Sequence, residues 1–149
     1  MPRIERTAEI TWEGNLARGS GSITAASSGA FAGLGYTLAS RIGDPEGRTS
    51  PEELLAAAHG GCFTTSLAGE LTRLGHPPGQ LEVSCRIIMD EVEGQGHQIV
   101  GSQVTASVIA PGLDEPTLAE ATRLADEGCA FSALLRRAGA TLEIRTALA

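Results

Sequence analysis

The chain has 149 residues, enough to bury a hydrophobic core, and 42% of them are hydrophobic while 19% are charged, as in globular proteins. A formal net charge of −7 argues against nucleic acid or an anionic membrane as the main partner, and no run of about 18 apolar residues suggests a membrane span. Three unevenly spaced cysteines and an N-terminus without an apolar secretory signal indicate a cytoplasmic protein.

The first third of the chain is predicted to form three strands. Two of them cover residues 6–13 and 19–26 and are joined by a turn around Gly14. The third runs from Gly35 to Ile42, and a polar loop over residues 43–49 follows it.

A well-signalled helix comes next. Ser50 is the expected N-cap, Pro51 occupies the first helical position, and Glu53 stands three residues after the cap, which is the pattern of a capping box. From Leu54 to Leu71 the helix has almost no polar face, so we expect a long central helix that is buried all round. It should end near Gly75, because two prolines follow.

The second half of the chain predicts two alternating strands, two helices and a last strand. In chain order these elements are strands over Leu81–Glu91 and Gln98–Ala110, helices over 114–127 and Ala130–Arg137, and a strand over Thr141–Leu148. This order of elements indicates one α+β domain over residues 1–149, with largely antiparallel sheets.

The three cysteines allow different interpretations. Cys85 lies on the apolar face of a strand and is expected to be a small core residue. Cys62 stands three residues after His59 on the central helix, so it could be inert, form a hydrolytic pair with His59 as base, or be a redox thiol.

Cys129 favours the redox interpretation. It stands at the start of a short helix, where free backbone amides lower the pKa of a thiol and make it a good leaving group in disulfide exchange. Cys62 and Cys129 therefore suggest an attacking and a resolving cysteine. We expect no metal, because no close ligand pair such as Cys-x-x-Cys occurs, and no cofactor.

Several segments resemble the OsmC/Ohr family, the osmotically inducible protein C and organic hydroperoxide resistance proteins. Residues 50–63, Ser-Pro-Glu-Glu-Leu-Leu-Ala-Ala-Ala-His-Gly-Gly-Cys-Phe, resemble its signature, and residues 127–132 resemble its second cysteine motif, with Ala130 where proline is usual. Residues 10–14 and 18–21 are similar to the N-terminal strands of the OsmC branch. The resemblance covers nearly the whole chain and implies an α+β fold and an intertwined homodimer with shared active sites.

The resemblance also implies a thiol-dependent peroxidase that reduces organic hydroperoxides to alcohols. Cys62 matches the peroxidatic cysteine and Cys129 the resolving one, while Arg41, at the end of the third expected strand, and Glu52 match the family's active-site arginine and glutamate. Arg48 is the second candidate for the arginine, because the loop before the helix is about one residue longer than the family pattern.

The implied cycle passes through a sulfenic acid on Cys62 and a disulfide with Cys129, which an external dithiol, such as a lipoyl group, reduces. Ten helical residues span about 15 Å, so Glu52 cannot lie beside Cys62 of its own straight helix, and we expect it to act with Arg41 in the partner subunit's site. Small residues that permit close helix packing, in a dimer or against the chain's own sheet, are Ala56, Ala57, Ala58, Gly60, Gly61 and Gly69. The apolar residues expected around an organic substrate are Phe63, Phe131, Leu134 and Leu135.

Two alternatives stay open from the residues alone. One is a hydrolase built on Cys62 and His59, which has no need of Cys129. The other is a non-enzymatic redox sensor or small-molecule binding protein on the same fold.

Overall fold

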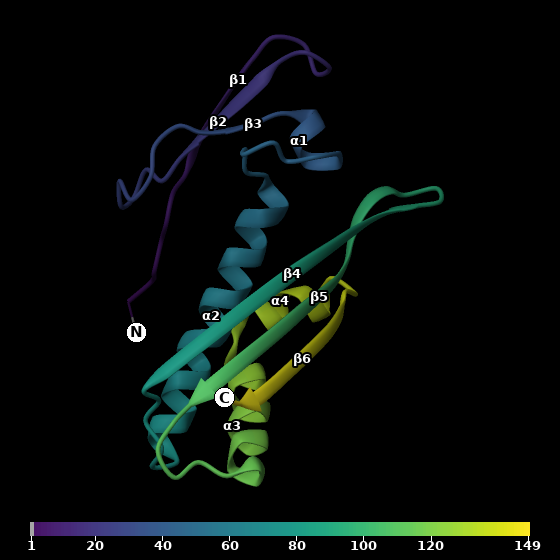
Figure 1. Ribbon diagram of the computed structural model, residues 1–149. Helices are drawn as coiled ribbons and strands as arrows, with labels where there is room; N and C mark the ends of the chain where they lie inside the picture. The colour runs from purple at the N-terminus through teal and green to yellow at the C-terminus, as the bar shows by residue number, and fades with distance from the viewer. Residues whose placement is uncertain (1) are drawn as a thin grey trace. The chain divides into compact units, whose positions relative to one another are not determined.

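The structure, a computed structural model, describes residues 2–149 and divides the chain into two compact units (Figure 1). The first unit ends at Leu54 and the second begins at Leu55, within the long helix α2 (Pro51–Arg73). The single domain predicted over residues 1–149 stays a prediction. Among the residues described, no helix has both the length and the apolar character that a membrane crossing needs.

A three-stranded antiparallel sheet forms the centre of the first unit. It contains β1 (Glu9–Glu13), β2 (Ser20–Thr24) and β3 (Leu34–Tyr36), in that order. The rings of Trp12 and Tyr36 pack against each other over Gly21, with their centroids 5.7 Å apart. A Cβ at Gly21 would lie 2.3 Å from the Tyr36 ring, so only glycine allows this packing.

The predicted third strand, Gly35–Ile42, is wrong beyond Tyr36, because the chain turns there into helix α1 (Leu38–Ile42). The Thr37 hydroxyl accepts a hydrogen bond from the Ser40 N–H at 3.0 Å, and the Ser40 hydroxyl accepts one from the Thr37 N–H at 2.9 Å. This capping box satisfies backbone groups locally and so competes with strand pairing. Arg41 consequently lies in the last turn of a helix, not at the end of a strand.

A second three-stranded sheet belongs to the second unit. Its strands are β4 (Gln80–Val92), β5 (Gly96–Ile109) and β6 (Thr141–Leu148), in that order. The β4–β5 pair is antiparallel as predicted, whereas β6 runs parallel to β5. Parallel pairing needs a crossover connection, and here α3 (Glu115–Gly128) and α4 (Ala130–Arg137) provide it.

The helices of the second unit cover one face of this sheet, behind the strands in the view of Figure 1. Residues from α2, β5 and α3 form the core, and alternate residues of β4 and β6 pack against it. Helix α2 approaches β4 closely at Gly60, where an added Cβ would lie 3.1 Å from the Cβ of Cys85. Gly60 therefore allows the helix to pack against the chain's own sheet.

The prediction that α2 is buried all round is not confirmed within this chain. One stripe of the helix is fully buried, at His59, Phe63, Leu67 and Leu71. The exposed positions between the ends of the helix are all small: Ala57, Gly61, Thr65 and Gly69. The sheet covers only one side of the helix, so the helix retains an uncovered small-residue stripe, by which we mean these four residues.

Helix α2 begins as its capping signal predicts, with one difference. The Ser50 hydroxyl accepts a hydrogen bond from the Glu53 N–H at 3.0 Å. The Glu53 carboxylate does not close the box but accepts a hydrogen bond from the Thr49 hydroxyl at 2.9 Å. The first turn of α2 is therefore fixed to the preceding loop as well as to its own cap.

Candidate functional site

Two of the predicted site residues, Cys62 and Cys129, lie together in the second unit. Cys62 is half-buried on α2, and Cys129 is fully buried where α3 gives way to α4. The Cys129 thiol and the backbone N–H groups of Ala130 and Phe131 lie close enough to Cys62 to shift the pKa of its thiol. Both cysteines are free thiols.

The backbone between α3 and α4 places Cys129 in this position. Cys129 is the C-cap of one helix and the N-cap of the next, with an extended conformation at φ −84° and ψ 112°. Its N–H donates to the Asp126 carbonyl at 3.2 Å, and its carbonyl accepts from the Ala133 N–H at 3.1 Å. Helix α4 starts at Ala130 even though this position lacks the proline that the family pattern favours.

The surroundings of Cys62 disfavour its thiolate within a single chain. Burial raises the pKa of the Cys62 thiol, and the neighbouring Cys129 thiol shifts this pKa in the same direction. The N–H groups of Ala130 and Phe131 lower the pKa, but they do not outweigh burial. A further positive charge near Cys62 would favour the nucleophilic thiolate at neutral pH.

Arg41 and Glu52 form an ion pair in the first unit. The Arg41 Nε donates to one Glu52 oxygen at 3.3 Å and its Nη2 to the other at 2.5 Å, which gives a bidentate arrangement. Burial alone would raise the pKa of Glu52, but hydrogen bonds from Arg41 and the backbone outweigh it, so the pKa is lowered. The hydrogen bond to Glu52 raises the pKa of Arg41. Both groups are therefore ionised at neutral pH.

The second candidate arginine, Arg48, lies in the loop before α2, where its N–H donates to the Pro45 carbonyl at 2.9 Å. Of the two candidate arginines, Arg41 is the one whose side chain pairs with Glu52. The side chain of Arg41 is 36% exposed and that of Glu52 is 16% exposed, so the Arg41 side chain stays partly accessible to solvent.

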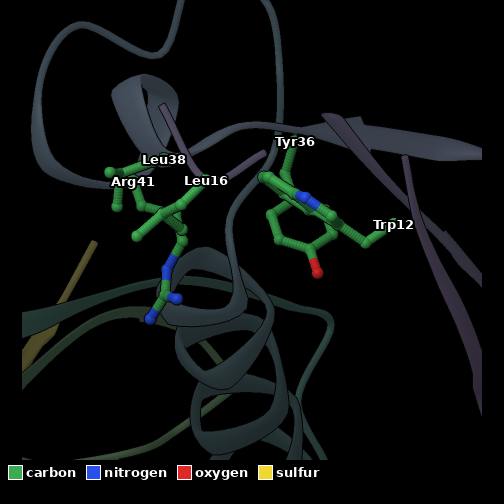
Figure 2. Close-up of a pocket in the computed structure, with 5 residues that line it drawn as sticks. All are labelled: Trp12, Leu16, Tyr36, Leu38 and Arg41. Carbon is green, nitrogen blue, oxygen red and sulfur yellow. The ribbon is translucent and has the colours of Figure 1, made fainter. Parts of the chain in front are cut away.

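An apolar pocket of about 330 Å³ lies next to Arg41 in the first unit (Figure 2). The rings of Trp12 and Tyr36 form one side of it, and Leu16 and Leu38 lie with the Arg41 side chain on the other. This pocket was not predicted from the sequence, because its residues come from β1, β3, α1 and the turn before β2 and meet only in the folded chain.

The apolar residues that the sequence analysis assigned to a substrate pocket have different positions. Phe63 and Leu135 are buried, Phe63 in the core of the second unit. Phe131 is half-buried against the same core, while Leu134 is 54% exposed. Phe63 and Leu135 are therefore packing residues.

His59 is hydrogen-bonded away from Cys62, which argues against the hydrolase alternative. One ring nitrogen lies 2.7 Å from the Ser102 hydroxyl and the other 2.9 Å from the Ser132 hydroxyl. Burial lowers the pKa of His59. With both nitrogens bound to serines, no nitrogen is left to accept a proton from Cys62. Cys85 packs against the core, as expected.

The fold and the site together define a small α+β protein with a pair of adjacent cysteine thiols next to a helix N-terminus. Residues 43–145 match the family of OsmC-like proteins. The chain is 30% identical over 133 residues to the Peroxiredoxin OsmC of Escherichia coli. This alignment covers 89% of this chain and 91% of the relative. The chain therefore belongs to the OsmC-like family.

Solved structures show the same fold at low sequence identity. An organic hydroperoxide resistance protein from Elizabethkingia anophelis aligns over 100% of both chains with a TM-score of 0.79 and 17% identity. An organic hydroperoxide resistance protein OsmC from Legionella pneumophila aligns over 97% of this chain and 99% of its own, with a TM-score of 0.75 and 18% identity. Their mixed architecture agrees with the α+β class predicted from the order of elements.

Proposed function

We propose that this protein is a thiol-dependent peroxidase that reduces organic hydroperoxides to alcohols. The observation that carries the proposal is that two free thiols are neighbours: Cys62 on α2 lies next to Cys129 at the start of α4. Membership of the OsmC-like family and similarity to a relative named as a peroxiredoxin support it.

The first half of the cycle is oxidation of Cys62. Its thiolate attacks the terminal oxygen of the hydroperoxide, a sulfur–oxygen bond forms and the oxygen–oxygen bond breaks. The departing alkoxide takes up a proton and leaves as an alcohol. Cys62 is thereby oxidised to a sulfenic acid, while the peroxide is reduced.

The second half of the cycle restores the thiols. The Cys129 sulfur attacks the sulfenic sulfur, the sulfur–oxygen bond breaks, and hydroxide leaves as water with the proton of the Cys129 thiol. An external dithiol, of which a lipoyl group is one chemical type, then reduces the disulfide by thiol exchange and is itself oxidised to a disulfide.

A second copy of the chain supplies the cation that the Cys62 thiolate needs. Helix α2 carries both Glu52 and Cys62, and ten residues of a straight helix rise about 15 Å, which is too far for one shared site. Large apolar residues in the first unit also favour a partner, since Ile10, Leu16 and Ile42 are 56%, 65% and 57% exposed. The small-residue stripe of α2 would let such a partner approach closely. The Arg41–Glu52 pair of one subunit then acts on Cys62 of the other.

The pocket beside Arg41 takes the carbon group of the hydroperoxide. Ligand sites are mostly apolar with few polar groups that fix orientation, and four of the five lining residues are apolar or aromatic. Arg41 donates hydrogen bonds to the peroxide oxygens as charge develops on them. Such a site favours organic hydroperoxides over hydrogen peroxide, which has no carbon group to bury.

Three cysteine variants test the proposal. Cys62→Ser should abolish dithiol-dependent reduction of cumene hydroperoxide, and Cys129→Ser should stop after one turnover with a sulfenic acid that dimedone traps on Cys62. Cys85→Ser is the matched control and should retain turnover. Mass spectrometry of the wild type after one equivalent of peroxide should show a Cys62–Cys129 disulfide. Full activity of Cys62→Ser would overturn the proposal, whereas reversible disulfide formation without turnover by any dithiol would identify a redox sensor instead.

A further inference from the structure

His59 is the centre of a buried polar cluster that the proposed reaction does not use. It lies on α2 and is fully buried. One ring nitrogen, Nδ1, is 2.7 Å from the hydroxyl of Ser102 on β5, and the other, Nε2, is 2.9 Å from the hydroxyl of Ser132 on α4. The Cys85 sulfur, on β4, lies 3.5 Å from the Ser102 hydroxyl and 3.8 Å from Nδ1.

The position of this cluster relates it to the two thiols. His59 precedes Cys62 by three residues on α2, and Ser132 follows Cys129 by three residues on α4. Residues three apart on a helix lie on the same face, about one turn from each other. The His59–Ser132 hydrogen bond therefore joins the two helices one turn away from the place where the thiols meet.

The cluster is complete and neutral, which makes its geometry specific. Burial lowers the pKa of His59, so at neutral pH one ring nitrogen donates and the other accepts, and a serine hydroxyl can take either role. Every buried side-chain nitrogen and oxygen in residues 2–149 has a hydrogen-bond partner. Removing one partner would leave a buried polar atom unsatisfied, so the cluster holds its members in one arrangement.

We propose that His59 is a positioning residue for the resolving step: its hydrogen bond to Ser132 fixes α4 against α2 so that Cys129 can reach Cys62. The His59–Ser102 bond has a different role, since it fixes the ring to the sheet. His59 touches neither reacting sulfur through a hydrogen bond and transfers no proton in this scheme. Its role in catalysis rests on the proposed function, but the ease with which Cys62 and Cys129 form a disulfide is measurable without any peroxide.

Two serine variants separate the two hydrogen bonds of the ring. Ser132→Ala removes the bond between α2 and α4, and Ser102→Ala, the matched control, removes an equally buried hydroxyl from the same ring. Each protein is equilibrated with reduced and oxidised glutathione, quenched in acid, and assayed for the Cys62–Cys129 disulfide. We expect Ser132→Ala to lower the effective concentration of the two thiols by about 10- to 100-fold, the cost of a small misplacement, and Ser102→Ala by less than about threefold.

Two variants of His59 test the same two hydrogen bonds by changing the ring instead of the serines. The amide nitrogen of glutamine can replace Nε2 and keep the bond to Ser132, whereas that of asparagine can replace Nδ1 and keep the bond to Ser102. We therefore expect His59→Gln to retain the effective concentration of the wild type and His59→Asn to behave like Ser132→Ala. If Ser132→Ala does not fold, as judged by circular dichroism, the glutamine and asparagine pair decides the question.

Kinetics extend the test to the proposed reaction. With cumene hydroperoxide, Ser132→Ala should form the Cys62 sulfenic acid at the wild-type rate but convert it to the disulfide about 10- to 100-fold more slowly, so that dimedone traps more of it. Equal losses in Ser132→Ala and Ser102→Ala, or no loss in Ser132→Ala and His59→Asn, would overturn the inference. A wild type that forms no sulfenic acid would overturn the proposed function, while the glutathione titration would still decide the role of His59.

Discussion

The proposed sharing of the active site between two subunits predicts that two inactive variants restore each other. Cys62→Ser lacks the attacking thiol, and Arg41→Ala lacks the cation, so each alone should be inactive. In a heterodimer of the two, one site contains the Cys62 of the Arg41→Ala chain and the Arg41 of the Cys62→Ser chain. That site is complete only if Arg41 acts across the interface, as we propose from the rise of about 15 Å between Glu52 and Cys62 along α2.

The expected recovery follows from counting sites. A fully exchanged equal mixture contains about half heterodimers, each with one complete site of two, so it should show about a quarter of wild-type activity. The reciprocal mixture combines the wild type with a chain that carries both substitutions. It should show about a quarter of wild-type activity if Arg41 acts across the interface, and about a half if it acts within its own chain.

The assay is steady-state reduction of cumene hydroperoxide with a dithiol in excess, and native mass spectrometry verifies that heterodimers have formed. No recovery in the first mixture, with heterodimers present, would refute the reasoning about α2. A protein that native mass spectrometry finds only as a monomer would refute it as well.

Three further predictions concern the pocket, the ion pair and His59. Trp12 is the single tryptophan of the chain and lines the pocket, so its fluorescence should change when cumyl alcohol binds to the Cys62→Ser protein. Leu16→Asp should weaken this binding. If the titration is the same with Leu16→Asp, the pocket is not part of the site. Glu52→Gln replaces one acceptor of the bidentate pair with Arg41 by an N–H₂ group. Because Arg41 is partly exposed, we expect this to weaken the pair by about 1 kcal/mol and to lower kcat/KM about 5- to 10-fold. Arg48→Ala is the control and should leave kcat/KM unchanged. The lowered pKa of His59 means that the unfolded chain binds its proton more readily, so this contribution to stability is present above pH 6.5 and is lost as the pH falls below it towards the folded value. Asp126 opposes this shift and Arg136 supports it, so chemical unfolding at pH 5 to 7.5 should show a shallower pH dependence in His59→Gln, and an unchanged dependence would contradict the assignment.

Most of the second unit could be predicted because its signals are local. Alternating residues defined β4, β5 and β6, and Asp114 caps α3 by accepting from the Thr117 N–H at 2.9 Å. The parallel pairing of β6 with β5 could not be predicted, because it depends on how the crossover helices pack. The first unit was less predictable, since the capping box of Thr37 and Ser40 interrupted an apparently extended segment.

The candidate site likewise has features that could be predicted from the sequence and features that could not. The position of Cys129 at a helix start suggested an attacking and a resolving cysteine, and the resemblance to the OsmC/Ohr family implied which role each thiol takes. The two serines that bind His59 carry no sequence signal, because they lie on other elements and become its partners only in the folded chain. His59 itself was noticed only as a neighbour of Cys62, and its hydrogen bonds assign it a different role.

The raised pKa of Cys62 within a single chain has a consequence for how the protein is protected. In the proposed assembly, a newly made or dissociated subunit holds its thiol protonated and reacts slowly with oxidants, because the activating cation arrives only with a partner. Over-oxidation of unassembled chains is thereby limited. Specific activity should then fall on dilution below the dimer dissociation constant, so that subunit concentration itself sets the reactivity of the thiol.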